Sequence, residues 1–469
     1  MSVELKRTTF ETSRASEYFD ARELAAQTGQ PRENFAAVAL KELMDNALDA
    51  CETGKVAPVI ELETGEEGGT IHLAVSDNGP GIKPETVRRI LNYETRTSDK
   101  AAYRSPTRGA QGNALKTVLG IPHALGSEEP VGIQARGVRH TVRAWTDPAG
   151  ELRINHDEEP VGYDPGGTRI SLSCPAGGQS FDPDHWVASF AAFNPHATFI
   201  FKRGSRYPRG SHLANGSDPE TAKIYKSSTS GTSWRKFGPT DPTSAHWYDD
   251  ETLKKLVFSH IASARRGGRD LPLGEFVRQF RGLSSSAKAK TVCDELENVK
   301  RLSDFERGPG KVSRLLAAMK ENSKAPSHNV LGAVGEDHFR GRFEAAYNVA
   351  EFTYRKAKGE FPGSAGLPFT FEFALAVTDA PGRLYCGINF SPTFGDPLEG
   401  TRLDGPEFEA HGIRGFLLQG HALPDTGAWY EAPANVAVAA HIITPAPVFL
   451  DRGKTRLQLG GEDRREHER

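Results

Sequence analysis

Apolar and polar residues follow two different periods along this chain, and each period predicts its own kind of element. From Glu33 to Cys51 the apolar residues recur every three or four positions, which predicts an amphipathic helix. Alternation with a period of two predicts strands over residues 59–64 and 70–78, and a helix is predicted over 84–93. Later strands are predicted at residues 131–137, 140–146, 152–157 and 168–174. These elements indicate an α/β sandwich in which helices cover an antiparallel or mixed sheet.

The rest of the chain predicts a lid, a helical middle and a second sheet. Residues 94–112 are polar and too many for an ordinary connection, so they predict a lid or a disordered segment before a helix that begins at Asn113. Residues 208–245 are rich in Gly, Ser, Thr and Pro and predict an exposed connection. Helical periodicity dominates from Glu251 to Asn322. Strand-like runs then predict a second α/β unit, and they cover residues 369–378, 383–391, 412–423 and 434–450.

Length and composition restrict the class of protein. A chain of 469 residues is longer than one core usually organises, which predicts two or three domains. Because no apolar run approaches the ~20 residues of a membrane helix, and the N-terminus has no signal-peptide core, we expect a cytoplasmic protein. The cysteines are far apart and form no CxxC pair, so we expect reduced thiols rather than disulfides or a zinc site. They are Cys51, Cys174, Cys293 and Cys386.

Charge is distributed unevenly along the chain. The net charge is −3, but residues 201–330 contain 24 Lys and Arg against 14 Asp and Glu. Such a basic segment predicts either contacts with the phosphate backbone of DNA or an ordinary solvated helical face.

The first motif with candidate chemistry lies in the helix KELMDNALDA, residues 41–50. Glu42 and Asn46 are four positions apart, so both project from one face of the helix, with Asp49 nearby. A carboxylate and an amide on one face can hold a metal ion and a water. The alternative is a core helix with incidental polar residues.

The second motif, SDNGPGI, follows a predicted strand at residues 76–82. Gly79 and Gly81 let the backbone turn sharply and approach a flat ligand, while Asp77 offers a hydrogen-bond acceptor. An exocyclic amine such as adenine N6 would suit that acceptor. A plain tight turn is the alternative interpretation, because these residue types are common in turns.

The third motif, TRGAQGNALKT, joins the predicted lid to a helix at residues 107–117. Gly109 and Gly112 lead directly into the helix, whose first N–H groups and positive dipole end can hold phosphates. Lys116 adds a cation one turn further on.

The order of these motifs, with GGTRI at residues 166–170 after them, resembles the GHKL ATPase superfamily of gyrase, heat-shock chaperones, MutL proteins and sensor histidine kinases. The resemblance implies a Bergerat nucleotide fold in which Glu42 is the general base and Asn46 binds Mg²⁺. It also implies that Asp77 contacts adenine and that Thr168 supports it through water. The ATP-binding residues so implied are Asn46, Asp49, Asp77, Gly79, Gly81, Ile82, Arg108, Gly109, Gln111, Gly112, Asn113, Lys116 and Thr168.

Within the superfamily the chain resembles the B subunit of topoisomerase VI and its bacterial relatives. Four stretches carry this resemblance: ASEYFDARELAAQTG, ELMDNALDA, SPTRGAQGNALKT and LGAVGED, the last at residues 331–337. A sensor kinase is disfavoured because only about forty residues precede the first motif. The family implies a transducer domain with a lysine that reaches the γ-phosphate, and Lys454 has the corresponding placement; an exposed turn lysine is the alternative. Ala114 departs from the family, which has a third glycine there.

The expected fold class is α+β, and the expected function is an ATP-operated dimerising gate on DNA. The expected cofactors are ATP and Mg²⁺, and the expected partners are a second copy of the chain, the DNA backbone and a separate tyrosine nuclease that cuts DNA. The alternatives are a nucleotide-gated clamp for DNA or protein outside any topoisomerase, and a binder that does not hydrolyse ATP.

The expected parts are a dimerisation segment (1–30), the ATPase domain (31–207), a connection (208–250), a basic helical segment resembling a helix-two-turn-helix insert (251–338), a transducer-like domain (339–460) and a charged tail (461–469).

Overall fold

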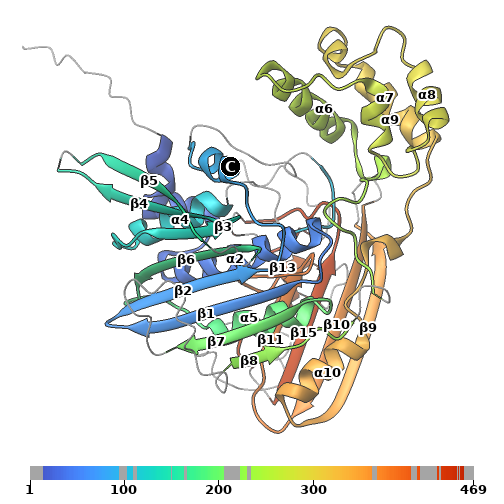
Figure 1. Cartoon of the computed structure of the whole chain (residues 1–469). Helices are drawn as coiled ribbons and strands as arrows, with labels where there is room; N and C mark the ends of the chain where they lie inside the picture. Colours follow the sequence, from blue (N-terminus) through green and yellow to red (C-terminus); the bar gives the residue numbers. More distant parts are fainter. Residues whose placement is uncertain are drawn as a thin grey trace, which may run out of the picture.

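The N-terminal half of the chain is built on one large sheet (Figure 1), seen in a computed structural model. The structure describes residues 14–93, 103–108, 114–148, 150–162, 166–204, 222–229, 234–361, 367–402, 409–411, 430–432, 435–451, 453 and 455–458. Across the described residues the strand order is β5-β4-β3-β6-β2-β1-β7-β8, and only β1 and β7 run parallel. These strands are β1 (Val59–Glu67), β2 (Thr70–Asp77), β3 (Val131–Ala135), β4 (Val138–Thr146), β5 (Leu152–Pro160), β6 (Thr168–Pro175), β7 (Thr198–Gly204) and β8 (Ala222–Tyr225).

Helices cover one face of this sheet and form its core. The helices are α2 (Phe35–Thr53), α4 (Ala114–Ala124) and α5 (Pro183–Phe193). Leu43, Met44 and Leu48 of α2 are buried against Val118 of α4 and the sheet. A short helix, α3 (Pro84–Ile90), follows β2. The expected sandwich of helices on a mixed sheet is therefore confirmed, although the hydrophobic pattern did not predict α5, β7 or β8.

The N-terminal segment packs against the helices of the large sheet. It contains η1 (Arg14–Tyr18) and α1 (Ala21–Thr28). A Cβ atom on Gly120 of α4 would lie 1.7 Å from the carbonyl oxygen of Tyr18, so only glycine allows this close approach. Residues 14–30 therefore pack against the rest of the same chain, while residues 1–13 of the predicted dimerisation segment lie outside the described residues.

The middle of the chain forms a helical body (Figure 1), and its apolar core is continuous with buried residues of the C-terminal sheet. Its helices are α6 (Asp250–Arg265), α7 (Leu273–Arg278), α8 (Ser286–Asp294) and α9 (Lys311–Glu321), with short 3-10 turns η4 (Ala245–Trp247), η5 (Leu302–Arg307) and η6 (His328–Leu331). The predicted exposed connection is wrong in part, because Phe237, Ala245 and Trp247 are buried in this core. Apolar side chains spaced too irregularly for a period supply that burial.

The C-terminal part is a second, five-stranded sheet with the order β12-β11-β15-β10-β9. Its strands are β9 (Val349–Glu360), β10 (Pro368–Thr378), β11 (Leu384–Ile388), β12 (Ser391–Pro392) and β15 (Val436–Ile443), preceded by α10 (Glu336–Ala346). A separate pair, β13 (Glu399–Arg402) and β14 (Glu409–His411), follows β12. The sheet confirms a second α/β unit, while the predicted strand at 412–423 lies outside the described residues.

Two further features are whether any helix could cross a membrane and the state of the cysteines. Among the described helices, none combines the length and the apolar character needed to cross a bilayer. All four cysteines are free thiols, as expected, and Cys51, Cys174 and Cys386 are buried.

Candidate functional site

Helix α2 presents the first two candidate residues on its less buried side. Glu42 and Asn46 are both half-buried one turn apart, while Leu43, Met44 and Ala47 between and beside them are buried. The amphipathic pattern therefore fixes which face of the helix enters the core and leaves the carboxylate and the amide facing outward. Their oxygen donors suit a hard cation such as Mg²⁺.

The loop after β2 is shaped by its glycines. The N–H of Gly79 donates to Oδ1 of Asp77 at 2.8 Å, and a Cβ on Gly79 would lie 3.2 Å from the backbone of Ala50 on α2. Gly81 has φ +74°, and a Cβ there would lie 2.8 Å from the carbonyl oxygen of Gly167. Asn78 ties the loop to the chain before β1 by donating to the carbonyl of Ala57 at 3.0 Å.

The GGT motif at the start of β6 supports this loop. Gly167 has φ +71°, and a Cβ at this position would lie 1.7 Å from the carbonyl oxygen of Asp77. Thr168 is buried, and its Oγ1 accepts the N–H of Ile82 at 3.2 Å. The antiparallel pairing of β2 with β6 sets the two motifs side by side although about ninety residues separate them. The structure thus brings together Asp77, Gly79, Gly81, Ile82 and Thr168.

The carboxyl group of Asp77 titrates in an unusual range. Burial raises the pKa of Asp77 to about 6, although hydrogen bonds with the N–H groups of Gly79 and Thr168 favour its charged form. Above that pH the group is a partly buried acceptor, which suits an amine of a flat ligand such as adenine.

Lys116, a predicted phosphate ligand, has another environment. Its ammonium group donates to the carbonyl of Asn92 at 2.6 Å and lies 5.7 Å and 5.5 Å from the ring centres of Tyr18 and Tyr93. The side chain is buried, and this burial lowers the pKa of Lys116. Lys116 thus holds Tyr18 of the N-terminal segment by cation–π contact, and its contact with phosphate stays a prediction.

Arg108, at the end of the predicted lid, is also placed differently from the expectation. Its guanidinium is fully buried beside α2, 2.8 Å from Oε1 of Glu52 and 3.4 Å from Oδ1 of Asp49. It also donates to the side-chain oxygen of Asn194 and to the carbonyl of Phe390, the latter at 3.2 Å. Asp49, another predicted ATP ligand, faces Arg108 through this contact.

Glu52 is the centre of this buried cluster. Its Oε1 lies 2.7 Å from Nζ of Lys236 and 2.9 Å from Nε2 of His196, in addition to Arg108. Burial opposes its ionisation, but the charges of Arg108 and Lys236 hold the pKa of Glu52 well below its usual value. Burial lowers the pKa of Lys236 to about 8, with the charge of Arg108 acting in the same direction. The carboxylate of Glu52, on α2, thus contacts three other segments: the predicted lid through Arg108, the residues after α5 through His196, and the predicted connection through Lys236.

The same cluster reaches the C-terminal sheet. Asn389 and Phe390 both have positive φ, 51° and 65°, in the two-residue turn between β11 and β12. A bulky residue such as Phe rarely adopts this conformation. The turn is fixed by the N–H of Phe390, which donates to Nε2 of His441 at 3.0 Å, and by Oγ of Ser391, which donates to Asp45 of α2 at 2.7 Å.

A buried Glu–His pair continues this path to the start of the C-terminal part. Nδ1 of His441 lies 3.1 Å from Oε2 of Glu372, and both side chains are fully buried. Glu372 accepts the N–H groups of Val334 and Gly335, each at 2.8 Å, within the LGAVGED stretch. Hydrogen bonds therefore run without a break from residues 334–335 through the turn to α2.

Several predicted residues cannot be placed. Gly109, Gln111, Gly112, Asn113 and Lys454 lie outside the described residues. In the other direction, sequence reasoning missed the partners of Arg108, because a single carboxylate, amide or lysine has no local pattern that reveals burial. These missed residues are Glu52, Asn194, His196, Lys236, Phe390 and His441.

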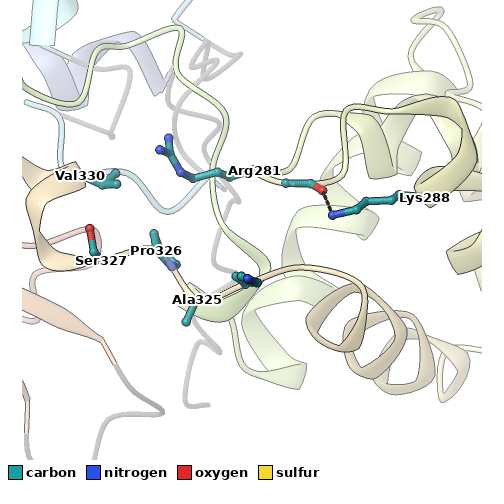
Figure 2. Close-up of a pocket in the computed structure, with 8 residues that line it drawn as sticks. Arg281, Lys288, Ala325, Pro326, Ser327 and Val330 are labelled. Atoms are coloured by element: carbon teal, nitrogen blue, oxygen red, sulfur yellow. Dashed lines mark hydrogen bonds between the residues drawn. The ribbon is translucent and has the colours of Figure 1, made fainter.

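A separate hollow lies in the basic helical part. Figure 2 shows this pocket, of about 340 Å³, where Arg281, Lys288 and Lys324 contribute cations to the lining. Nζ of Lys288 donates to the carbonyl of Gly282 at 3.1 Å, which fixes that side chain at the rim.

The fold and the loop geometry define a class of protein. Helices on a mixed sheet, a helix with Glu42 and Asn46, and the interlocked 77–82 and 166–168 motifs have the arrangement expected of a GHKL ATPase domain. Residues 32–178 match the family described as histidine kinase-, DNA gyrase B-, and HSP90-like ATPase. The chain therefore contains a domain similar in sequence and fold to the GHKL ATPases.

Curated relatives narrow the resemblance. The B subunit of type 2 DNA topoisomerase 6 from Natronomonas pharaonis is 31% identical over 193 residues, which are 40% of this chain and 24% of the relative. The B subunit from Archaeoglobus fulgidus is 27% identical over 197 residues, and that from Halobacterium salinarum is 31% identical over 174 residues. These matches cover 40% and 34% of this chain and 32% and 21% of the relatives. The domain is thus like that of the topoisomerase VI B subunit, and the match spans about a fifth to a third of these relatives.

Proposed function

We propose that this chain is the ATP-binding and ATP-hydrolysing subunit of a type IIB topoisomerase-like complex, acting as an ATP-operated gate on DNA. The names of the relatives support the class of complex. One observation carries the proposal: the helix that bears Glu42 and Asn46 is joined, through neighbouring carboxylates of the same helix, to the C-terminal sheet by the buried Arg108 cluster.

We call the proposed nucleotide site, formed by Glu42, Asn46 and residues 77–82 and 166–168, the cup. Its residues have separate tasks in this proposal. Asp77 accepts the adenine amine, and Gly79 and Gly81 let the backbone approach the ring. The amide oxygen of Asn46 holds Mg²⁺, which neutralises phosphate charge when bound. Glu42 orients a water and takes its proton as that water attacks the γ-phosphate. The backbone of residues 109–113 and Lys454 are proposed phosphate contacts, and both lie outside the described residues.

The gate follows from the position of Arg108. This residue ends the lid segment, yet its guanidinium contacts α2 and the turn at Phe390 together. A lid that closes over ATP pulls on Arg108, and a packed ionic cluster has discrete arrangements rather than a continuum. We infer that nucleotide binding shifts the C-terminal sheet between two states.

The partners complete the proposal. DNA contacts the basic helical part through its phosphates, and the pocket of Figure 2 with Arg281, Lys288 and Lys324 suits a phosphate group. ATP brings together two copies of the chain, and a separate tyrosine nuclease cuts the DNA.

Replacing Glu42 tests the chemical part. Glu42→Ala should bind ATP with unchanged affinity and lose ATP turnover by at least about 100-fold, because a general base contributes 10²–10⁴-fold. Turnover is measured by phosphate release and affinity by calorimetry with a non-hydrolysable analogue. Glu33→Ala is the matched control, because this exposed glutamate precedes the same helix. Normal hydrolysis by Glu42→Ala would overturn the assignment.

A clamp outside any topoisomerase is the second candidate, favoured by the limited span of the match to the relatives. The two are separated by copurification in the presence of the analogue. A tyrosine nuclease bound in stoichiometric amount supports the topoisomerase-like complex. A closed dimer that holds DNA without any nuclease supports the clamp.

A further inference from the structure

Three metal-ligand side chains meet at the outer edge of the large sheet, away from the motifs of the cup. They are His140 on β4 and His156 and Glu158 on β5, the outermost hairpin in Figure 1. The antiparallel register pairs His140 with Glu158 and Val142 with His156. Because residues two apart on a strand share a face, all three side chains project to the same face as buried Val142.

The three ligand atoms have the spacing of a coordination site. Nδ1 of His140 lies 3.0 Å from Nε2 of His156, and these two atoms lie 3.6 Å and 3.7 Å from Oε1 of Glu158. A triangle with these sides has a point about 2.0 Å from every corner. That distance is the length of a Zn–N or Zn–O bond, which is about 2.0–2.2 Å.

We propose that His140, His156 and Glu158 bind a divalent cation of the zinc class. Two imidazoles and one carboxylate are a donor set that zinc takes with a fourth position left for water. Nitrogen donors also distinguish this site from the oxygen donors of Glu42 and Asn46, which suit Mg²⁺. The competing interpretation is a plain hydrogen bond between two stacked imidazoles, whose ring planes are 18° apart.

The surroundings of the carboxylate favour a built site. Arg88 donates from Nε to Oε1 of Glu158 at 2.7 Å and from Nη2 to Oε2 at 2.5 Å, so the carboxylate is held in one orientation. Ligating carboxylates are commonly hydrogen-bonded in this way by a second residue. The side chain of His140 is fully buried, which restricts its ring to one position as well.

The position suggests what the cation does. Arg88 belongs to α3, the helix directly after the 77–82 loop, so a cation on Glu158 ties β4 and β5 to that helix. This would stiffen the side of the loop that faces away from α2. The inference is independent of ATP hydrolysis, because it concerns binding of the cation by the apo chain.

The experiment is a calorimetric titration of ZnCl₂ into the full chain after dialysis against a chelator. We expect one ion per chain, at least a tenfold loss of affinity in His156→Ala and a loss in Glu158→Gln. His72→Ala is the matched control, because His72 is also half-buried on the large sheet, where its Nδ1 contacts Oγ of Ser173 at 2.9 Å. The control should bind zinc like the unaltered chain.

Two outcomes would overturn the proposal. One is the absence of one-to-one binding at micromolar zinc, and the other is unchanged affinity in a folded His156→Ala. Should His156→Ala fail to fold by circular dichroism, Co²⁺ in the unaltered chain decides the question. Visible bands shifted from those of aqueous cobalt support nitrogen ligands, and an aqueous spectrum contradicts the site.

Discussion

At the scale of single residues, Asp77 has a partly buried carboxyl group that must be ionised to accept the proposed hydrogen bond from adenine. Its side chain sits among backbone N–H groups, but partial burial still makes its pKa high, at about 6. A carboxylate in this position accepts a hydrogen bond, whereas the protonated acid presents a donor to the same ligand. Perturbed titration of this kind is typical of functional sites.

The pKa of Asp77 predicts how adenine nucleotides bind as pH changes. Below about pH 6 the free protein carries a proton on Asp77 that adenine binding must displace, so affinity falls as pH falls. The ratio of ADP to IDP affinity should drop about tenfold between pH 7 and pH 5, measured by calorimetry.

Inosine diphosphate is the control because its phosphates titrate like those of ADP while its base lacks the amine. A ratio that stays constant over this pH range would show that Asp77 does not receive the adenine amine.

At the scale of elements, two strands and their flanking glycines define the cup more tightly than any single side chain does. Gly166 and Gly167 both have positive φ, 77° and 71°, just before β6. A Cβ on Gly167 would lie 1.7 Å from the carbonyl oxygen of Asp77, while a Cβ on Gly166 would meet nothing within 4 Å. Comparing alanine at the two positions therefore separates the cost of a left-handed backbone from the cost of the close contact with Asp77.

Gly167→Ala should destabilise the chain far more than Gly166→Ala. A left-handed alanine costs about 1–2 kcal/mol at either position. Overpacking against Asp77 adds about 1–3 kcal/mol at residue 167 alone, so its total should be about 2–5 kcal/mol. Urea unfolding followed by circular dichroism measures both.

Gly167→Ala should also lose nucleotide binding, because its Cβ displaces the loop. Equal losses of stability in the two variants would mean that the loop yields easily, and the tight contact would then have no role.

At the scale of the whole molecule, the Arg108 cluster is one of the places where the two sheets are joined, and we propose that the gate acts through it. Removing one member of a buried ionic cluster commonly costs 3–5 kcal/mol, because the remaining charges lose their partner. Lysine keeps the charge but cannot replace the planar, multiply donating guanidinium. Arg108→Lys is thus a milder way to disconnect α2 from the turn at Phe390.

Hydrogen exchange should reveal this connection. In the unaltered chain, a non-hydrolysable ATP analogue should slow exchange in the cup and also at residues 384–392. In Arg108→Lys the slowing should be confined to residues 35–178. Arg383→Lys is the control, because Arg383 pairs with Asp182 at 2.9 Å and joins the same two parts without touching α2. If the analogue still slowed hydrogen exchange at residues 384–392 in Arg108→Lys, the cluster would have no part in the gate.

Local patterns in the sequence predicted most of what is local in the structure. The period of residues 33–51 gave helix α2 with Glu42 and Asn46 on its less buried side, and the glycines of the 77–82 loop gave its turn. Both follow from rules that act within one or two turns of chain. By contrast α5 and β7 were missed, since their apolar runs are short and have no clear period.

Residues whose partners are distant in sequence were beyond such rules. Arg108 and Lys116 were predicted only as ATP ligands, and nothing in the sequence indicated that one lies against Glu52 and the other near Tyr18 and Tyr93. A charged side chain has no local signal for the partner it finds after folding, because that choice depends on desolvation and on which elements pack together. The same reason hid His140, His156 and Glu158, which only strand register brings together.

The helices and strands with a clear period, the turns that need glycine and the motifs that we propose for the cup can be read from the linear chain. Folding alone ties helix α2 to the second sheet and makes two histidines and a glutamate converge on one point. The physical reason is distance along the chain: periodicity and turn chemistry act between neighbours, whereas ion pairs and ligand sets form between segments that meet only in the folded protein.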